Sequence, residues 1–146
     1  MQILRTLLVA AVAAAQISHS SITDPVLVQA VVAGDAVTIQ SIGRVRLLGI
    51  KAPAGEHGVL RGEPFGREAM DRLTGLAARR WVRLEFDPAS ASRRAAYVLL
   101  EDGTCLNTLL VREGLAHVTG GESLSRYREL KDAEAAARTA RRGIWR

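Results

Sequence analysis

The change of hydrophobic period near residue 64 restricts the fold of this chain more than any other feature of its sequence. Before it, three short segments rich in Val, Ile and Leu are separated by Gly-containing turns, at 26–32, 36–41 and 44–50. After it, over residues 64–79, apolar residues recur at steps of three and four with charged residues between them. Short apolar runs between turns predict strands, and the second pattern predicts an amphipathic helix. We therefore expect three consecutive antiparallel strands and then a helix.

The chain continues with two more strands and a short helix. Residues 81–86 and 93–101 have the composition of strands. Asn107 is predicted to cap the helix that follows, because an Asn side chain can accept a hydrogen bond from the first turn of a helix. Gly114 is predicted to end this helix, because Gly readily adopts the left-handed conformation found at helix ends.

A last helix is expected near the C-terminus. It should start near Ser123 or Ser125, and Gly143 should stop it. The chain then has five short strands, one helix after the third strand and two helices at the end. This order predicts an α+β fold, a five-stranded Greek-key barrel of the OB type with about three helices packed on it.

Residues 1–20 are interpreted as a signal peptide and residues 24–146 as the folded domain. Arg5 supplies a positive charge, residues 6–15 form an apolar run, and small residues follow. This pattern is typical of a secretory signal, and the run is too short to span a bilayer, which takes about 20 apolar residues. We expect the mature protein to be exported to the periplasm or the medium, monomeric and without a transmembrane segment.

The charge of the chain favours an anionic partner. It has 20 Lys and Arg against 15 Asp and Glu, a formal net charge of +5. A basic balance is common in proteins that bind nucleic acid, but it does not identify the ligand. The single cysteine, Cys105, cannot form an internal disulfide and is interpreted as a small buried residue. His117 lies in an apolar stretch and is interpreted as structural.

Six short motifs, in order along the chain, resemble those of the staphylococcal nuclease (thermonuclease) family. Together they cover about residues 26–146, and the agreement of their order makes the resemblance specific. They are the turn at 32–37, the strand at 45–50 followed by Pro53, the helix start at 62–69, the hairpin turn Asp102-Gly103, the helix with Asn107, 110–111 and 114–116, and the ending at 143–145.

The resemblance implies a set of site residues. In that family two aspartates bind Ca²⁺, a glutamate acts as base or positions a water molecule, and two arginines bind the phosphate. Matched position by position, the first aspartate falls on Asp35 and the two arginines fall on Arg46 and Arg93. Since Arg94 adjoins Arg93, a shift of one residue in this loop would exchange their roles.

Four other positions depart from the family pattern. The second metal-binding aspartate falls on Lys51 and the glutamate falls on Ala54, while Ala91 and Gly120 stand where tyrosines near the nucleotide are expected. Ca²⁺ requires several oxygen ligands, and an ammonium group repels it. We therefore expect Asp35 to be at most a residual metal ligand, Ca²⁺ not to serve as a cofactor, and metal-dependent hydrolysis to be weak or absent.

Three functions remain open at this point. The first is a working nuclease in which Glu56 or His57 replaces the missing groups. The second is a non-catalytic module in which Arg46, Lys51 and Arg93 bind nucleic acid or another phosphate-containing anion. The third is a protein-interaction domain, because a fold does not fix a function.

Overall fold

The structure is a computed structural model that describes residues 21–56 and 61–146. The signal peptide predicted at residues 1–20 lies outside the described residues, and so does His57. Within the described ranges, no helix combines the length and the apolar character that a membrane span requires.

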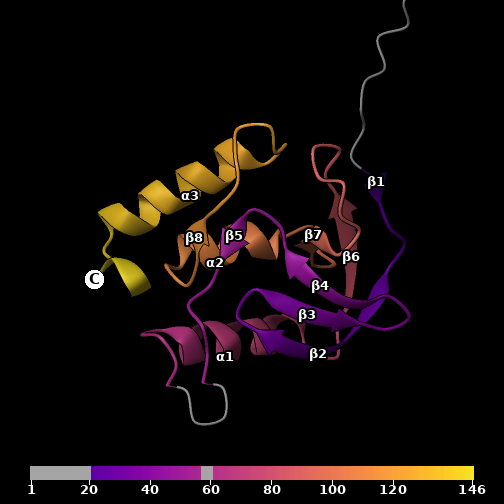
Figure 1. Cartoon of the computed structure of the whole chain (residues 1–146), viewed down its shortest axis with the longest axis horizontal. Coiled ribbons are helices and arrows are strands. Elements are labelled where there is room, and N and C mark those ends of the chain that lie inside the picture. Colours follow the sequence, from indigo (N-terminus) through magenta and orange to yellow (C-terminus); the bar gives the residue numbers. More distant parts are fainter. Residues whose placement is uncertain (1–20, 57–60) are drawn as a thin grey trace, which may run out of the picture.

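Five strands close into a barrel (Figure 1). Strands β2, β3 and β4 are consecutive and antiparallel, β4 then pairs in parallel with β7, and β6 pairs with both β7 and β2. This closed barrel confirms the predicted α+β fold of the OB type. Its strands are β2 (Val26–Ala33), β3 (Ala36–Ile39), β4 (Gly43–Leu47), β6 (Trp81–Phe86) and β7 (Ala95–Leu99).

Three two-residue strands extend this framework. β1 (Ser21–Ile22) pairs with β6, and β5 (Ile50–Lys51) pairs with β8 (His117–Val118). The predicted strand at 44–50 is thus broken in two. The break occurs at Gly49, which has a φ of 78° and turns the chain away from the barrel. A Cβ at Gly49 would lie 2.9 Å from Cδ1 of Leu130, so the turn also needs the absence of a side chain.

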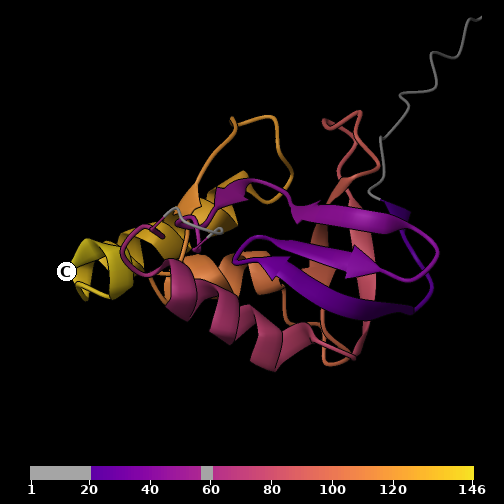
Figure 2. The same cartoon turned by 60° about the horizontal axis from the view of Figure 1, so that its bottom comes forward.

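Three α-helices and one 3₁₀-helix cover one side of the barrel (Figure 2). They are α1 (Gly66–Ala77), α2 (Leu106–Arg112), α3 (Tyr127–Thr139) and η1 (Gly143–Trp145). Helix α1 begins two residues later than predicted because Phe65 adopts a left-handed conformation with a φ of 67°. At the other end of the chain, η1 docks on the end of α2, where the Ile144 nitrogen donates to the Gly114 carbonyl oxygen at 2.9 Å.

Asn107 does not cap α2, so that prediction was wrong. Cys105 stands at the N-cap position, and the Asn107 side chain is fully buried. Its Oδ1 accepts a hydrogen bond from the Val98 nitrogen at 3.0 Å, and its Nδ2 donates to the carbonyl oxygens of Leu48 at 2.8 Å and Ala96 at 3.2 Å. Asn107 therefore joins the end of β4 to β7 where the parallel pairing of these two strands stops, and this closes the barrel.

Helix α3 starts at Tyr127, two residues after Ser125 and so near the predicted start, because Ser125 itself is engaged elsewhere. Its backbone nitrogen and its hydroxyl both donate to Oδ2 of Asp87, at 2.7 Å and 2.8 Å. The same oxygen accepts the hydroxyl of Tyr97 at 2.8 Å. The buried Asp87 thus ties the end of β6 to β7 and to the segment before α3, and it fixes where that helix begins.

Candidate functional site

Asp35 forms the turn between β2 and β3 and contacts the chain beyond β5. Its Oδ2 accepts a hydrogen bond from the Ala52 backbone nitrogen at 3.0 Å. Its own carbonyl oxygen accepts the Leu47 nitrogen at 2.8 Å. The half-buried Asp35 is therefore held against β4 and the segment after β5, with one carboxylate oxygen already used by the backbone.

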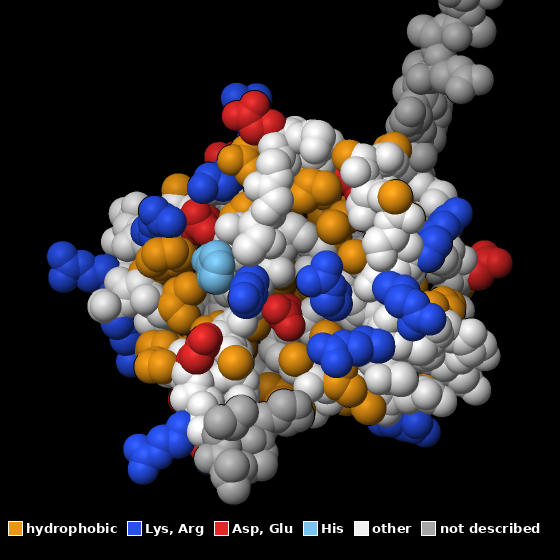
Figure 3. Space-filling view, in the orientation of Figure 1, with side chains coloured by type: hydrophobic (Ala, Val, Ile, Leu, Met, Phe, Trp, Pro, Cys, Tyr) orange, Lys and Arg blue, Asp and Glu red, His pale blue; other side chains and the backbone are white. Residues whose placement is uncertain are grey.

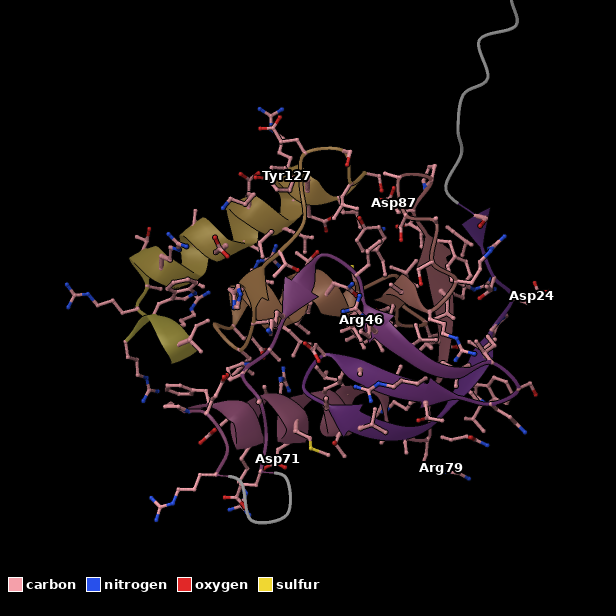
Figure 4. The ribbon with its side chains drawn as sticks, viewed as in Figure 1. Asp24, Arg46, Asp71, Arg79, Asp87 and Tyr127 are labelled. Carbon is pink, nitrogen blue, oxygen red and sulfur yellow. The ribbon has the colours of Figure 1, made fainter. Side chains whose placement is uncertain are left out.

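Arg46 lies on the outer face of β4, between the buried Val45 and Leu47 (Figure 4). Its backbone nitrogen donates to the Arg94 carbonyl oxygen at 2.8 Å, which holds it beside the start of β7. The side chain is exposed and borders a hollow of about 270 Å³, here called the Arg46 hollow. The other lining residues are Leu47, Leu48, Gly49, Ile50, Ala89, Ser90, Thr119, Gly120, Gly121, Ser123 and Leu124.

Lys51 ends β5 and stands directly across from His117 of β8. Residues opposite one another in an antiparallel pair have Cβ atoms about 4.5–5.5 Å apart, so these two side chains are neighbours. Figure 3 shows Lys and Arg side chains across the middle of one face, beside the pale blue atoms of His117, the only histidine among the described residues. Asp35, Arg46 and Lys51 are thus brought close together by β3, β4 and β5.

The loop after β5 is closed by Glu63, a residue that the sequence analysis did not single out. Oε2 of Glu63 accepts the Ala54 nitrogen at 3.0 Å, and the Glu63 nitrogen donates to the Ala54 carbonyl oxygen at 2.8 Å. Its position just before Pro64 and the predicted helix was the available signal. Glu56 is exposed and lines a separate hollow with Glu63 and Phe65, so the structure does not place it with Arg46.

Arg93 is not part of the Arg46 hollow. Its guanidinium carbon lies over the Phe86 ring, 4.8 Å from the centroid, and the residue borders a smaller hollow of about 180 Å³. Ser90 lines both hollows, so they are adjacent. The structure therefore brings Arg46 and Lys51 near Asp35 and leaves Arg93 on the far side of Ser90.

The chemistry of the Arg46 hollow is that of a cationic, polar surface. Arg46 contributes a guanidinium, and Ser90, Thr119 and Ser123 contribute hydroxyls. No aromatic side chain is among its lining residues, and Gly120 occupies the wall where a tyrosine was expected. In the part of the chain that the structure describes, no three His, Cys, Asp or Glu side chains come together as a metal site would need. Such a surface can bind an anion through charge and hydrogen bonds.

A closed five-stranded barrel with helices to one side defines this domain as an OB-type α+β protein. The chain belongs to the staphylococcal nuclease family: the family model described as "Staphylococcal nuclease homologue" matches residues 44–146. This confirms the resemblance seen in the sequence motifs.

Two relatives agree with this membership. Thermonuclease of Staphylococcus intermedius is 32% identical over 126 residues, which are 82% of this chain and 74% of that protein. Staphylococcal nuclease domain-containing protein 1 of Drosophila melanogaster is 33% identical over 108 residues, which are 68% of this chain. The match spans only 12% of the Drosophila protein, so the likeness concerns one domain of it.

Proposed function

We propose that this domain binds nucleic acid through its phosphates at the Arg46 hollow and has little or no Ca²⁺-dependent hydrolytic activity. The observation that carries the proposal is the position of Lys51 at the end of β5. The next residue, Ala52, donates a hydrogen bond from its backbone nitrogen to the Asp35 carboxylate. The backbone of a cationic residue therefore adjoins the one carboxylate that the family pattern retains.

The residues present do not suit a Ca²⁺ ion. Ca²⁺ takes six to eight oxygen ligands at about 2.3–2.6 Å, usually with more than one carboxylate. Here Asp35 supplies one carboxylate, and its Oδ2 already accepts the Ala52 nitrogen. Replacing an aspartate by Lys51 changes the charge of the site by two units and places a cation near the metal position. In this proposal, the described residues therefore provide no adequate ligand set for the family's cofactor.

The glutamate that serves the family as base is also replaced here, by Ala54. Ala54 has no ionisable group, and its backbone nitrogen and carbonyl oxygen are both bonded to Glu63. Losing a general base costs about 10²–10⁴ in rate. Without metal and base, Arg46 can stabilise negative charge on a phosphate, but no described group is positioned to generate the nucleophile.

The same residues favour anion binding. Arg46 and Lys51 are exposed cations at neighbouring strand ends, and the hydroxyls of Ser90 and Ser123 can donate to phosphate oxygens. Arg93 joins them only when its guanidinium leaves the Phe86 ring and turns past Ser90. In this proposal Arg46 and Lys51 bind the phosphates, and Arg93 raises the affinity through a further contact.

Titration of the protein with a short single-stranded DNA in chelator tests the binding. Arg46→Ala and Lys51→Ala should each weaken binding and lower its salt dependence, because each removes about one phosphate contact. Arg128→Ala, which removes an exposed arginine from α3, is the matched control and should bind as the wild type does. Equal affinity of all four proteins would refute the proposed site.

Calorimetry with millimolar Ca²⁺ tests the metal. We expect no heat and no rise in melting temperature, because a ligand that binds only the folded state must stabilise it. A saturable site abolished by Asp35→Ala, together with chelator-sensitive DNA cleavage, would show a working nuclease. Loss of that cleavage in Glu56→Gln would then identify the substitute carboxylate.

We also propose that the protein is exported, on the basis of Arg5 and the apolar run that follows it. N-terminal sequencing of the protein from its native host should start between Gln16 and Thr23. An intact Met1 in the soluble cytoplasmic fraction would contradict export.

A further inference from the structure

Trp81 is the most exposed of the large apolar side chains that the structure describes, with 60% of its surface accessible. An indole offers the largest apolar area of any side chain and is usually mostly buried. Trp81 is the first residue of β6 and pairs with Leu27 of β2, so its backbone is fixed in the barrel. The ring is therefore held at the surface by a rigid strand.

The ring shares the hollows beside it with three arginines, Arg79, Arg80 and Arg83. Strand alternation places Arg83 on the same outer face as Trp81, because the residue between them is buried. Arg79 and Arg80 precede the strand, and Val28 holds their backbone: its oxygen accepts the Arg79 nitrogen and its nitrogen donates to the Arg80 oxygen, both at 2.9 Å. Arg83 donates one hydrogen bond from its guanidinium to the Thr23 carbonyl oxygen, at 3.3 Å. A guanidinium has five N–H groups, so others are available to a ligand.

Two hollows of similar size lie beside Trp81, about 420 Å³ and 430 Å³. Both also contact Glu101, which lies in the turn after β7, two residues beyond the Leu99 that pairs with Arg83. The first is lined by Pro25, Trp81, Val82, Arg83 and Glu101, and the second by Arg79, Arg80, Trp81, Leu100, Glu101 and Asp102. Each hollow therefore offers an indole wall and at least one guanidinium.

We propose that Trp81 is the platform of a second binding surface, on which a base of single-stranded nucleic acid stacks. Arg79, Arg80 and Arg83 contact the phosphates on either side of that base. Sequence-tolerant single-strand binding uses this combination of an aromatic face and cations along the backbone path. Glu101 repels phosphate, so the bound nucleic acid passes along the side of the Trp81 ring that carries the arginines.

This surface is separate from the Arg46 hollow and shares no residue with it. Figure 4 shows Arg79 at the margin of the molecule and Arg46 near its centre. The inference therefore goes beyond the proposed function and does not depend on it. The Arg46 hollow has no aromatic lining residue. In this proposal Trp81 provides the aromatic surface for base stacking, at a different place on the same domain.

The charges around Trp81 favour a nucleic acid over a protein partner. Three guanidiniums stand against the carboxylates of Glu101 and Asp102, and Asp102 already accepts the Thr104 nitrogen at 3.0 Å. A protein hot spot lies near the centre of an interface, within a ring of contacts that exclude water. Ile22, the next most exposed large apolar residue, lies toward the other end of β6, across from Glu85. Ile22 therefore does not extend the exposed indole into a wider apolar patch.

The test uses the full chain with a fluorescein-labelled oligothymidylate of about 10 nucleotides, in chelator and low salt. Binding should quench the tryptophan emission of the wild type but not that of Trp81→Phe, in which Trp145 is the tryptophan that remains. Trp81→Ala should weaken binding, followed by anisotropy, about 5-fold or more, whereas Trp81→Phe should retain most of the affinity. Glu101→Gln should tighten binding, because it removes the charge that repels phosphate.

Arg80→Ala should lower the salt dependence of binding, with a slope change of about 0.7 for one phosphate contact on a single strand. Arg128→Ala is again the matched control and should change neither the slope nor the affinity. Absence of quenching at saturation, or an affinity of Trp81→Ala equal to that of the wild type, would overturn the proposal. Saturable capture of a protein through Trp81 without any oligonucleotide binding would overturn it as well, in favour of a protein-docking surface.

Discussion

The carboxylate of Asp35 lies 3.0 Å from the backbone nitrogen of Ala52, 17 residues further along the chain. This hydrogen bond joins the β2–β3 turn to the segment after β5. It makes Asp35 a structural residue in this protein, whether or not a metal ever binds there.

Asp35→Ala should therefore destabilise the fold in the complete absence of Ca²⁺. A hydrogen bond to a charged group contributes about 1.5–3 kcal/mol to stability. Asp35 is only half-buried, so water can partly replace the lost partner, and we expect a loss of about 1 kcal/mol in the free energy of unfolding. Asp35→Asn keeps an acceptor oxygen and should lose less. Urea unfolding in chelator measures both. A wild-type midpoint for Asp35→Ala would mean that the hydrogen bond does not contribute.

Asn107→Ala should be among the most damaging single substitutions in the barrel. It leaves the Val98 nitrogen and the Leu48 oxygen without their partner in the interior, at about 1–3 kcal/mol for each buried group. Asn107→Asp is the informative comparison, because its second oxygen would face the Leu48 and Ala96 carbonyls. Acidification to about pH 4 protonates that carboxyl into a donor, so the stability of Asn107→Asp should rise where that of the wild type falls. Parallel pH profiles would contradict this account.

Asp87 should make the fold sensitive to acid. Burial alone would raise the pKa of Asp87, but the amides of Ala89 and Ser125 and the hydroxyls of Tyr97 and Ser125 donate to the carboxylate and hold its pKa below the ordinary value. A carboxyl with a depressed pKa in the folded state contributes stability above its unfolded pKa, about 3.9, and this is lost as the pH falls through the folded pKa.

The measurement is the free energy of unfolding between pH 6 and pH 2, with Asp87→Asn beside the wild type. The variant should be less stable at pH 6 and should lose less stability on acidification. Some acid sensitivity should remain, because the pKa of Glu134 is also lowered: burial would raise it, but the Val118 amide, Lys131 and Arg138 outweigh burial. Glu134→Gln is therefore the matched comparison. Identical slopes for Asp87→Asn and the wild type would rule out the linkage.

Lys51→Asp combined with Ala54→Glu should create Ca²⁺-dependent cleavage of single-stranded DNA. The double change restores the second metal carboxylate and the missing base beside Asp35 and Arg46. Each single change should do much less, since metal and base act on one transition state and their effects need not add. Calorimetry reports Ca²⁺ binding, and release of a labelled fragment reports cleavage. Adding Asp35→Ala to the double variant should abolish the Ca²⁺-dependent cleavage.

A double variant that binds Ca²⁺ but stays inert would show that the phosphate-binding arginines are not poised for catalysis. The stacking of Arg93 on Phe86 provides a physical reason for such a result. The protein-interaction function would then be the best remaining alternative.

The main elements were predictable from sequence because each carries a local pattern. The first three barrel strands and α1 follow from the switch of hydrophobic period near residue 64, and β6 and β7 follow from their own short apolar runs. The two-residue strands β5 and β8 could not be predicted, since a pair such as Lys51 and His117 is too short to show any period. Gly49, which separates β4 from β5, looks like any other residue within an apolar run.

Interactions distant in sequence were the part that local reasoning missed. The position of Asn107 before an apolar run is typical of a helix cap, and only the folded barrel brings Leu48 within reach of its side chain. The same applies to Glu63, whose carboxylate closes a loop back to Ala54. The proximity of Asp35, Arg46 and Lys51 follows from the adjoining strands, whereas the stacking of Arg93 depends on a loop that has no repeating pattern.

The hydrogen bond from Ile144 to Gly114 joins the end of α2 to a segment that follows α3. The two segments approach so closely that a Cβ added at Gly114 would clash with the Arg142 and Gly143 backbone, and a Cβ added at Gly143 would clash with the Gly114 backbone. A glycine at both positions is therefore a condition for this contact. A nonsense mutation anywhere in α3 would remove more than the residues after it, because the end of α2 would lose the segment that covers it.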